Sequence, residues 1–517
     1  MKKTFISAVA VLAFANVAAH ADELADIKQL RDQMSKRIAD LEKRQKTLEA
    51  QKAAVPTISP VDAMAADLPY KAAVKARPPE NDDLCIKGIC IYGNFDMGVT
   101  YQNHGAPMSP LAVGPLDYLV SKTSNGSYFG VGANQLSTSF IGLRGKQEIG
   151  DNLYAVFNLQ TQFDPASGQI SSGVGSVAQN NGLPLASQNA FSDSSKAGQM
   201  FNNAAYFGVS SPTYGTLTIG RQSALSSDLV TNYDALSGSN AFSLLTYQGA
   251  NGGGGDTENR IYDNSFEYRV NIGPVRLAAE AQLRNGGNSG TGNAFEGNIG
   301  FDYLGFSMDF VGGKIYDAVS ASPLTAAQAQ AATAFAVGNG QVAGTVSDNT
   351  VFQVGARYVI GPWKLFAGYE HVDFANPNNP LAAGAFLEGG FILTNPNNAN
   401  FPNDRILQTA WIGAKYSITP ALDITGAYYH EWQNSFASGA NTGCSTVVSS
   451  QCSGTLDAVS LVVDWRFARH MDMYAGAMWS QVQNGLASGF LQTNGTPGNT
   501  GNKANSVDPG IGLRYQF

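Results

Sequence analysis

The sequence predicts an all-β fold, a 16-stranded antiparallel transmembrane β-barrel with short periplasmic turns and long extracellular loops, preceded by an N-terminal α-helical coiled coil. Of the 517 residues, 57 are Gly and only 14% are charged, against about 25% in a typical globular protein. Segments in which apolar and polar residues alternate recur from residue 89 to the C-terminus. Their lengths of about 9–13 residues fit tilted strands that cross a bilayer. No apolar run after the first twenty residues reaches the roughly 18 residues of a membrane-spanning helix.

Residues 1–21 have the features of a secretory signal peptide. Lys2 and Lys3 precede an apolar stretch over residues 5–17, and Ala19-His20-Ala21 matches a cleavage site with small residues. A permanent N-terminal anchor is the weaker alternative, because the apolar stretch is too short to span a membrane. The mature chain is therefore expected in an oxidising compartment, where cysteines can pair.

The four cysteines form two local pairs, Cys85 with Cys90 and Cys444 with Cys452. Two short-range disulfides are the simplest interpretation. A metal site is the alternative, but the chain has no Cys-x2-Cys spacing and its five histidines form no cluster with ligand spacing. We therefore expect neither a metal nor a cofactor.

The mature chain changes character twice before the barrel. Residues 22–54 contain no Gly or Pro, and Ile27, Met34, Leu41 and Leu48 recur every seven residues. This heptad pattern predicts a periplasmic coiled coil, although basic residues at two of its core positions weaken the seam, and a single solvated helix is the alternative. Residues 55–84 are rich in Pro and Ala and are expected to be a semi-extended linker. The barrel is expected over residues 85–517.

Sixteen runs with a two-residue period can be followed in the barrel region. In the first, Phe95, Met97 and Val99 alternate with Asp96 and Thr100, which places apolar and polar side chains on opposite faces of a strand. The runs begin near residues 89, 137, 152, 203, 214, 260, 274, 294, 305, 350, 363, 406, 421, 455, 470 and 505.

The connections between these runs alternate between short and long. The long ones cover residues 102–136, 165–202, 223–259, 285–293, 316–349, 374–405, 434–454 and 483–504. An even number of strands with tight turns at one rim and long loops at the other is typical of an outer-membrane barrel. A soluble β-sandwich also alternates, but its strands are usually shorter, and charges of both signs on the polar face suit a water-filled lumen.

Several segments resemble the trimeric general-diffusion porins of Gram-negative outer membranes. They are Ile91-Tyr92-Gly93-Asn94-Phe95-Asp96, Phe140-Ile141-Gly142-Leu143-Arg144-Gly145-Lys146, Tyr214-Gly215-Thr216-Leu217-Thr218-Ile219-Gly220-Arg221-Gln222 and the terminal Gly512-Leu513-Arg514-Tyr515-Gln516-Phe517. The order of these segments extends over about four-fifths of the chain. The resemblance implies that the terminal strand, with Tyr515 and Phe517, is the signal that the barrel assembly machinery recognises.

The resemblance also implies that the third long loop, about residues 223–259, folds into the lumen and narrows it. Its acidic residues, expected at the constriction, are Asp228, Asp234, Asp256 and Glu258. The basic residues expected at the constriction or elsewhere in the lumen are Arg221, Arg144, Arg269 and Arg276, and Asp96 is the expected lumen acid. Arg221 shares parity with the lipid-facing Leu217 and Ile219, so it must lie where the strand ends and Gly220 allows a turn. For each wall residue, a neighbouring ion pair away from the constriction is the alternative.

The function expected from this resemblance is passive diffusion of small hydrophilic solutes and ions through a homotrimer in the outer membrane. The expected partners are outer-membrane lipid and lipopolysaccharide, the assembly machinery and, through the N-terminal helix, peptidoglycan. Residues 85–517 hold 28 acidic and 19 basic residues, which argues against nucleic acid and favours cations as permeant ions. No nucleophile–base motif indicates an enzyme. The alternative function is a barrel that mainly anchors or tethers the envelope through its helix.

Overall fold

The computed structural model divides the chain into two compact units, Met1–Ser59 and Pro60–Phe517. It describes residues 35–36, 84–104, 118, 127–170, 200–247, 260–283, 292–322, 341–380, 385–388, 391–398, 403–436, 453–484, 486 and 503–517. In the first unit only Ser35 and Lys36 are described, and both are helical. The predicted signal peptide, the rest of the heptad helix and the linker up to residue 83 lie outside the described residues.

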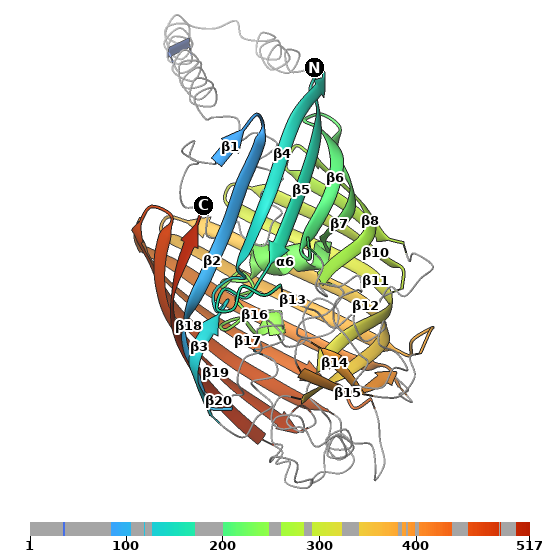
Figure 1. The fold of residues 1–517 in the computed structure, drawn as a ribbon, viewed down its shortest axis with the longest axis vertical. Coiled ribbons are helices and arrows are strands. Elements are labelled where there is room, and N and C mark those ends of the chain that lie inside the picture. The colour runs from blue at the N-terminus through green and yellow to red at the C-terminus, as the bar shows by residue number, and fades with distance from the viewer. Residues whose placement is uncertain are drawn as a thin grey trace, which may run out of the picture. The chain divides into compact units, whose positions relative to one another are not determined.

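The second unit is a closed antiparallel β-barrel (Figure 1). Its strands in the described residues are β2 (Ile89–Gln102), β3 (Tyr128–Ala133), β4 (Phe140–Gly150), β5 (Leu153–Gln162), β6 (Ala204–Ser211), β7 (Gly215–Ser223), β8 (Ile261–Ile272), β9 (Val275–Gln282), β10 (Ala294–Tyr303), β11 (Phe306–Ser322), β12 (Gln341–Ile360), β13 (Trp363–Ala375), β16 (Arg405–Thr419), β17 (Leu422–Gln433), β18 (Gly454–Ala468), β19 (Met471–Asn484) and β20 (Lys503–Gln516). Because β3 and β4 pair with successive parts of β2, they form one interrupted barrel strand. The described residues therefore build sixteen strand positions, as predicted.

Burial along the strands follows the predicted two-residue period. In β18, Val459, Leu461 and Val463 are exposed, whereas the intervening Ser460 and Val462 are buried. The exposed apolar face fits contact with lipid, since a transmembrane barrel turns its apolar side chains outward. Among the described residues, no helix is both long and apolar enough to cross a membrane.

The first and last strands close the barrel. β2 pairs with β20 from Asn94↔Gln516 to Thr100↔Gly510. The backbone N–H of Gly93 donates to the carbonyl oxygen of Phe517 at 2.8 Å, and the N–H of Phe517 donates back to Gly93 at 3.1 Å. The rings of Phe95 and Tyr515 each stack on the Phe517 ring, at centroid distances of 6.1 and 5.7 Å. Tyr515 and Phe517 therefore lie at the seam, and their recognition during assembly stays a prediction.

Three predicted loops contain more strand than expected, and the first of them, residues 102–136, contains β3. β11 continues to Ser322 and β12 begins at Gln341, so this hairpin extends well into the predicted loop over residues 316–349. The predicted loop over residues 374–405 contains β14 (Ala385–Glu388) and β15 (Phe391–Asn398), and β15 pairs in parallel with the start of β12. Both segments are rich in small and polar residues, so their strands lack the alternation that marks the membrane-spanning part.

The second barrel strand is interrupted, whereas the sequence predicted a continuous strand from about residue 137. Between β3 and β4, residues 134–139 leave the ladder with β2. The carboxylate of Asp96 accepts backbone hydrogen bonds from Leu136 at 3.0 Å and Ser137 at 2.7 Å, and a further bond from the Tyr474 hydroxyl. Because Asp96 is fully buried, its charge holds this segment, which we call the strand break, in place.

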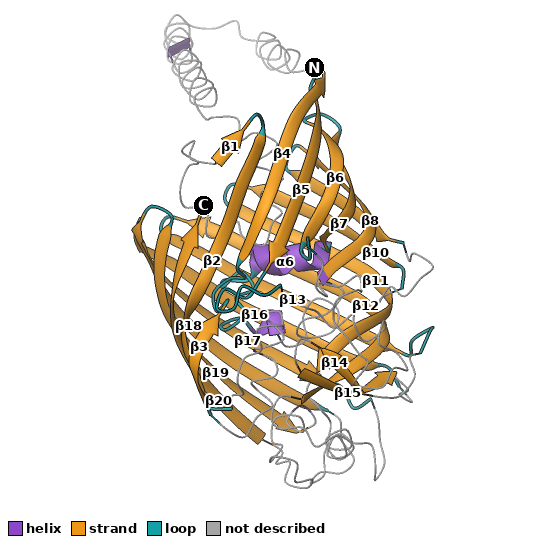
Figure 2. Ribbon diagram, in the orientation of Figure 1, coloured by secondary structure: helices purple, strands orange, loops and turns teal. Residues whose placement is uncertain are grey.

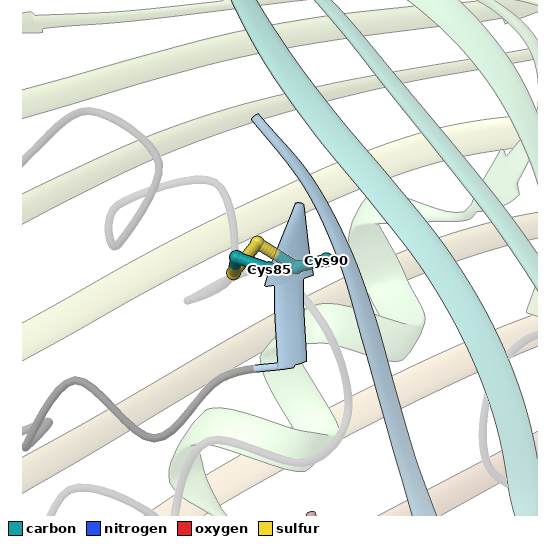
Figure 3. Close-up of a disulfide and its surroundings, with 2 residues drawn as sticks. All are labelled: Cys85 and Cys90. Atoms are coloured by element: carbon teal, nitrogen blue, oxygen red, sulfur yellow. A yellow bond between two sulfur atoms is a disulfide. The ribbon is translucent and has the colours of Figure 1, made fainter. Parts of the chain in front are cut away.

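A short strand, β1 (Leu84–Ile86), precedes the barrel and pairs with β2. Cys85 and Cys90 face each other in this hairpin and form a disulfide, with α-carbons 4.0 Å apart (Figure 3). Gly88 has a φ of 81°, which allows the turn between them. The predicted Cys85–Cys90 pairing is confirmed, while Cys444 and Cys452 lie outside the described residues.

Candidate functional site

The segment after β7 enters the interior of the barrel. A register shift between Gly220 and Gln222 interrupts the ladder with β8, and α6 (Leu225–Tyr233) follows soon after. Figure 2 shows α6 inside the ring of strands, where it contacts β9, β10, β11, β12 and β13. The short α7 (Leu244–Tyr247) ends the described part of this segment. Residues 224–245, which we call the inner segment, belong to the third predicted long loop.

Glycines on the interior face of the wall make room for the inner segment. A Cβ atom at Gly355 of β12 would lie 2.6 Å from the Tyr233 Cβ, and one at Gly413 of β16 would collide with Ala235. Gly476 and Gly510, register partners on β19 and β20, lie beneath the Phe242 ring. Part of the Gly excess therefore serves close approach within strands.

Tyr233 attaches the end of α6 to the wall. Its hydroxyl donates to Asp309 at 2.6 Å, lies 2.8 Å from the Ser307 hydroxyl and accepts a hydrogen bond from Arg276 at 2.9 Å. Its carbonyl oxygen accepts a bond from the Trp411 indole at 3.0 Å. Burial, reinforced by the Asp309 carboxylate, raises the pKa of Tyr233, so the phenol keeps the proton that it donates.

The second half of the inner segment crosses to the opposite wall. Asp234 accepts hydrogen bonds from the Gly238 N–H at 2.9 Å and the Tyr429 hydroxyl at 2.7 Å. Burial raises the pKa of Asp234 despite these donors. Phe242 is fully buried, its ring meets Tyr474 edge-on at 6.3 Å, and its carbonyl accepts a bond from Ser460.

The strand break also holds the inner segment, in addition to the wall contacts of Tyr233, Asp234 and Phe242. The backbone N–H of Ala241 donates to the Gln135 carbonyl at 2.9 Å, and the Ser239 hydroxyl donates to the same oxygen at 2.8 Å. The Asn240 side-chain amide donates to the Asn134 carbonyl at 2.8 Å. Asp96, which the sequence suggested as a lumen acid, therefore acts on the inner segment through the strand break.

Two of the predicted acidic residues are described, and both turn toward the wall. Asp228 forms an ion pair with Arg269, which also binds Glu267 at 2.6 Å. Asp234 is buried as described above, and Asp256 and Glu258 lie outside the described residues. The described loop acids thus attach the inner segment to the barrel.

Beneath α6, three glutamates stand in register on adjacent strands. Glu280 of β9 faces Glu267 of β8 and Glu296 of β10, and Glu296 accepts two hydrogen bonds from Ser226. All three glutamates are at most 9% exposed. The described residues contain no group of three or more His, Cys, Asp or Glu side chains placed to hold a metal ion. The sequence showed these acids one strand at a time, and only the register aligns them.

The four predicted basic residues lie in different surroundings. Arg269 and Arg276 contact α6 through Asp228 and Tyr233. Arg221 is turned inward at the register shift, where Gly220 has a φ of 138°, and pairs with Asp263 of β8 at 2.6 Å. The guanidinium of Arg144 lies 4.9 Å from the centre of the Tyr92 ring on the neighbouring strand.

A cavity remains between the inner segment and the wall. Its lining includes Gln160, Gln162 and Asn203 on the side of β5 and β6, and Ser227 and Thr231 from α6. The charged residues that line it in the described part of the chain are Arg260, Lys415, Asp464 and Arg514. Lys415 belongs to β16, and the fold places it at this cavity.

The comparisons with known proteins agree with this fold. A family model described as Gram-negative porin matches residues 8–485. The anion-selective porin from Comamonas acidovorans is 15% identical over 83% of this chain and 99% of its own, with a TM-score of 0.52. The Salmonella typhi OmpF complex with daunomycin is 16% identical over 83% and 97%, with a TM-score of 0.47. No curated protein matches. Because the family model matches nearly the whole sequence, the chain belongs to the Gram-negative porin family and is a β-barrel of the outer membrane.

Proposed function

We propose that the protein is a passive channel for small hydrophilic solutes and ions, in which the third long loop, residues 223–259, narrows the lumen and a charged constriction filters by size and charge. The observation that carries this proposal is the inner segment itself. It extends from the wall at β9–β13 to β17–β20 and leaves beside it a cavity whose lining includes polar and charged side chains. A segment fixed at both walls limits the size of a solute without closing the barrel.

The charged residues have two roles in this proposal. Asp228, Asp234, Arg269 and Arg276 fix the inner segment, since their contacts join it to the wall. The residues at the cavity, among them Lys415 and Asp464, meet the solute. Charged side chains beside a narrow aqueous path alter the local ion concentration and so the passage of ions.

Conductance in planar bilayers and swelling of liposomes in sugars of graded size test the channel. We expect discrete conductance steps and a sharp decrease of uptake with sugar size. Replacing residues 234–245 by a Gly-Ser chain of equal length should raise both the conductance and the size limit. Silent bilayers with correctly folded protein would refute the channel function.

The alternative is an envelope tether, in which residues 22–54 bind peptidoglycan and the barrel only anchors them. It is favoured by the heptad pattern, which a channel does not need. Deletion of residues 22–54 should abolish binding to purified peptidoglycan and leave conductance unchanged if both functions exist. Binding that survives the deletion would refute the tether.

The proposed assembly is a homotrimer, embedded in outer-membrane lipid and lipopolysaccharide and inserted by the barrel assembly machinery through its last strand. Crosslinking in mild detergent should give a trimer that dissociates on heating. Monomers alone would contradict it. No enzymatic activity is proposed.

A further inference from the structure

The charge that lines the cavity differs in sign from the formal charge of the barrel as a whole. Residues 85–517 have nine more acidic than basic residues. Four of those acids, Asp228, Glu267, Glu280 and Glu296, lie buried on or beneath α6. The described lining of the cavity instead holds three basic residues and one acidic residue. The net charge of the described cavity lining is therefore positive.

Lys415 lines this cavity, and a second lysine lies beside it on the adjacent strand. Lys364 of β13 and Lys415 of β16 are register partners, and both face the interior. The Cβ atoms of such partners lie about 5 Å apart, and like charges in this arrangement repel each other. Both side chains are half-buried near the rim of short turns. Within the described residues, neither forms an ion pair or a hydrogen bond.

The nearby acids are bound by arginines. Asp423 accepts a bond from Arg466 at 2.8 Å, and Asp464 lies 3.5 Å from Arg514, which also binds Asp472. These three aspartates are buried, and Asp423 and Asp464 attract Lys415. The two ammonium groups thus keep hydrogen-bond donors for a group that enters from the lumen.

We infer that Lys364 and Lys415 form a weak binding subsite for small anions, such as chloride, carboxylates and phosphate, and that the channel therefore prefers anions to cations. This inference rests on the proposed channel function. An anion between the two lysines relieves their mutual repulsion, and conduction requires a site that binds weakly enough to release its ion. The subsite raises the anion concentration beside the constriction.

The reversal potential in a tenfold KCl gradient tests this inference. We expect chloride preference in the natural protein and a decrease of the chloride-to-potassium permeability ratio by about fivefold in Lys415→Gln, the effect of a unit charge about 4 Å from an ion in water. Lys364→Gln should act similarly. The matched control is Lys314→Gln. Lys314 lies on the outward-facing side of β11 and donates to the Thr350 hydroxyl at 3.0 Å. Lys415→Arg should keep the preference.

Inorganic phosphate is a second probe of the same subsite. Added phosphate should lower the chloride conductance of the natural protein and of Lys314→Gln, and have little effect on Lys364→Gln/Lys415→Gln. Cation preference in the natural protein, or equal ratios in Lys415→Gln and the control, overturns the inference while the channel function stands. Absence of any conductance overturns both.

Discussion

The contact between Gly355 and Tyr233 provides a direct test of how the inner segment is held. In Gly355→Ala the added methyl group would lie 2.6 Å from the Tyr233 Cβ and 2.7 Å from its Cγ. These atoms are close to the backbone, so a change of side-chain rotamer cannot remove the clash. Tyr233 is also held by its hydroxyl and its carbonyl oxygen. The methyl group must therefore displace α6 or break these bonds.

Overpacking of this kind costs about 1–3 kcal/mol. The clash affects only the docked state of the inner segment, because the backbone of Gly355 lies on a regular ladder with β13 and has no positive φ. The ratio of docked to released inner segment should fall by roughly 5- to 150-fold. The strand itself should not weaken, since Ala suits a strand better than Gly.

Hydrogen exchange of the amides of α6 and single-channel conductance measure this change. We expect faster exchange over residues 225–233 and larger, noisier conductance in Gly355→Ala. The matched control is Gly297→Ala on β10, where a methyl group would meet only one atom, at 4.0 Å. Equal exchange and equal conductance in the two variants would refute the idea that the missing side chain of Gly355 makes room for the inner segment.

Three further predictions concern the rest of the inner segment. Phe242→Ala should speed exchange over residues 239–245 by about 100-fold or more, because loss of a buried Phe costs about 3–5 kcal/mol; Phe207→Ala, whose side chain faces outward, should change nothing. Because burial raises the pKa of Asp234, its carboxyl keeps its proton to a higher pH when the inner segment is docked than when it is released. Docking should therefore weaken, and channel noise should increase, as the pH rises from the pKa of the released state to that of the docked state. Asp234→Asn should abolish this pH dependence. Arg269→Gln should destabilise docking by about 3–5 kcal/mol, since it removes the guanidinium that binds the buried carboxylates of Asp228 and Glu267. Unchanged exchange of α6 would contradict this.

Much of the barrel could be predicted because each strand carries its own signal. Lipid contact on one face and water on the other impose alternation on every membrane-spanning run, and tight turns require Gly, Asn or Pro. The predicted starts near residues 152, 203, 214 and 294 agree with the observed strands within a residue or two. The strand break and β14–β15 were missed because apolar and polar residues do not alternate in them.

The candidate site was predicted only in outline. The sequence singled out the third long loop and identified Asp228 and Arg269 separately, but it did not pair them. Phe242 and Gly355 carried no signal at all, because an aromatic in a loop and a glycine in a strand are common in proteins of every kind. Phe242 contacts the wall and Gly355 contacts the inner segment, and both contacts depend on the path of the loop through the lumen.

The sequence by itself determined that sixteen strands form a barrel, which face of each meets lipid and in what order the strands follow one another. Those properties depend on neighbours one or two residues apart, and the bilayer imposes them equally on every strand. The tertiary structure alone decided that the loop acids turn to the wall, that three glutamates align beneath α6 and that Lys364 faces Lys415. Strand register and the path of the inner segment fix these contacts, and both depend on residues far apart in the chain.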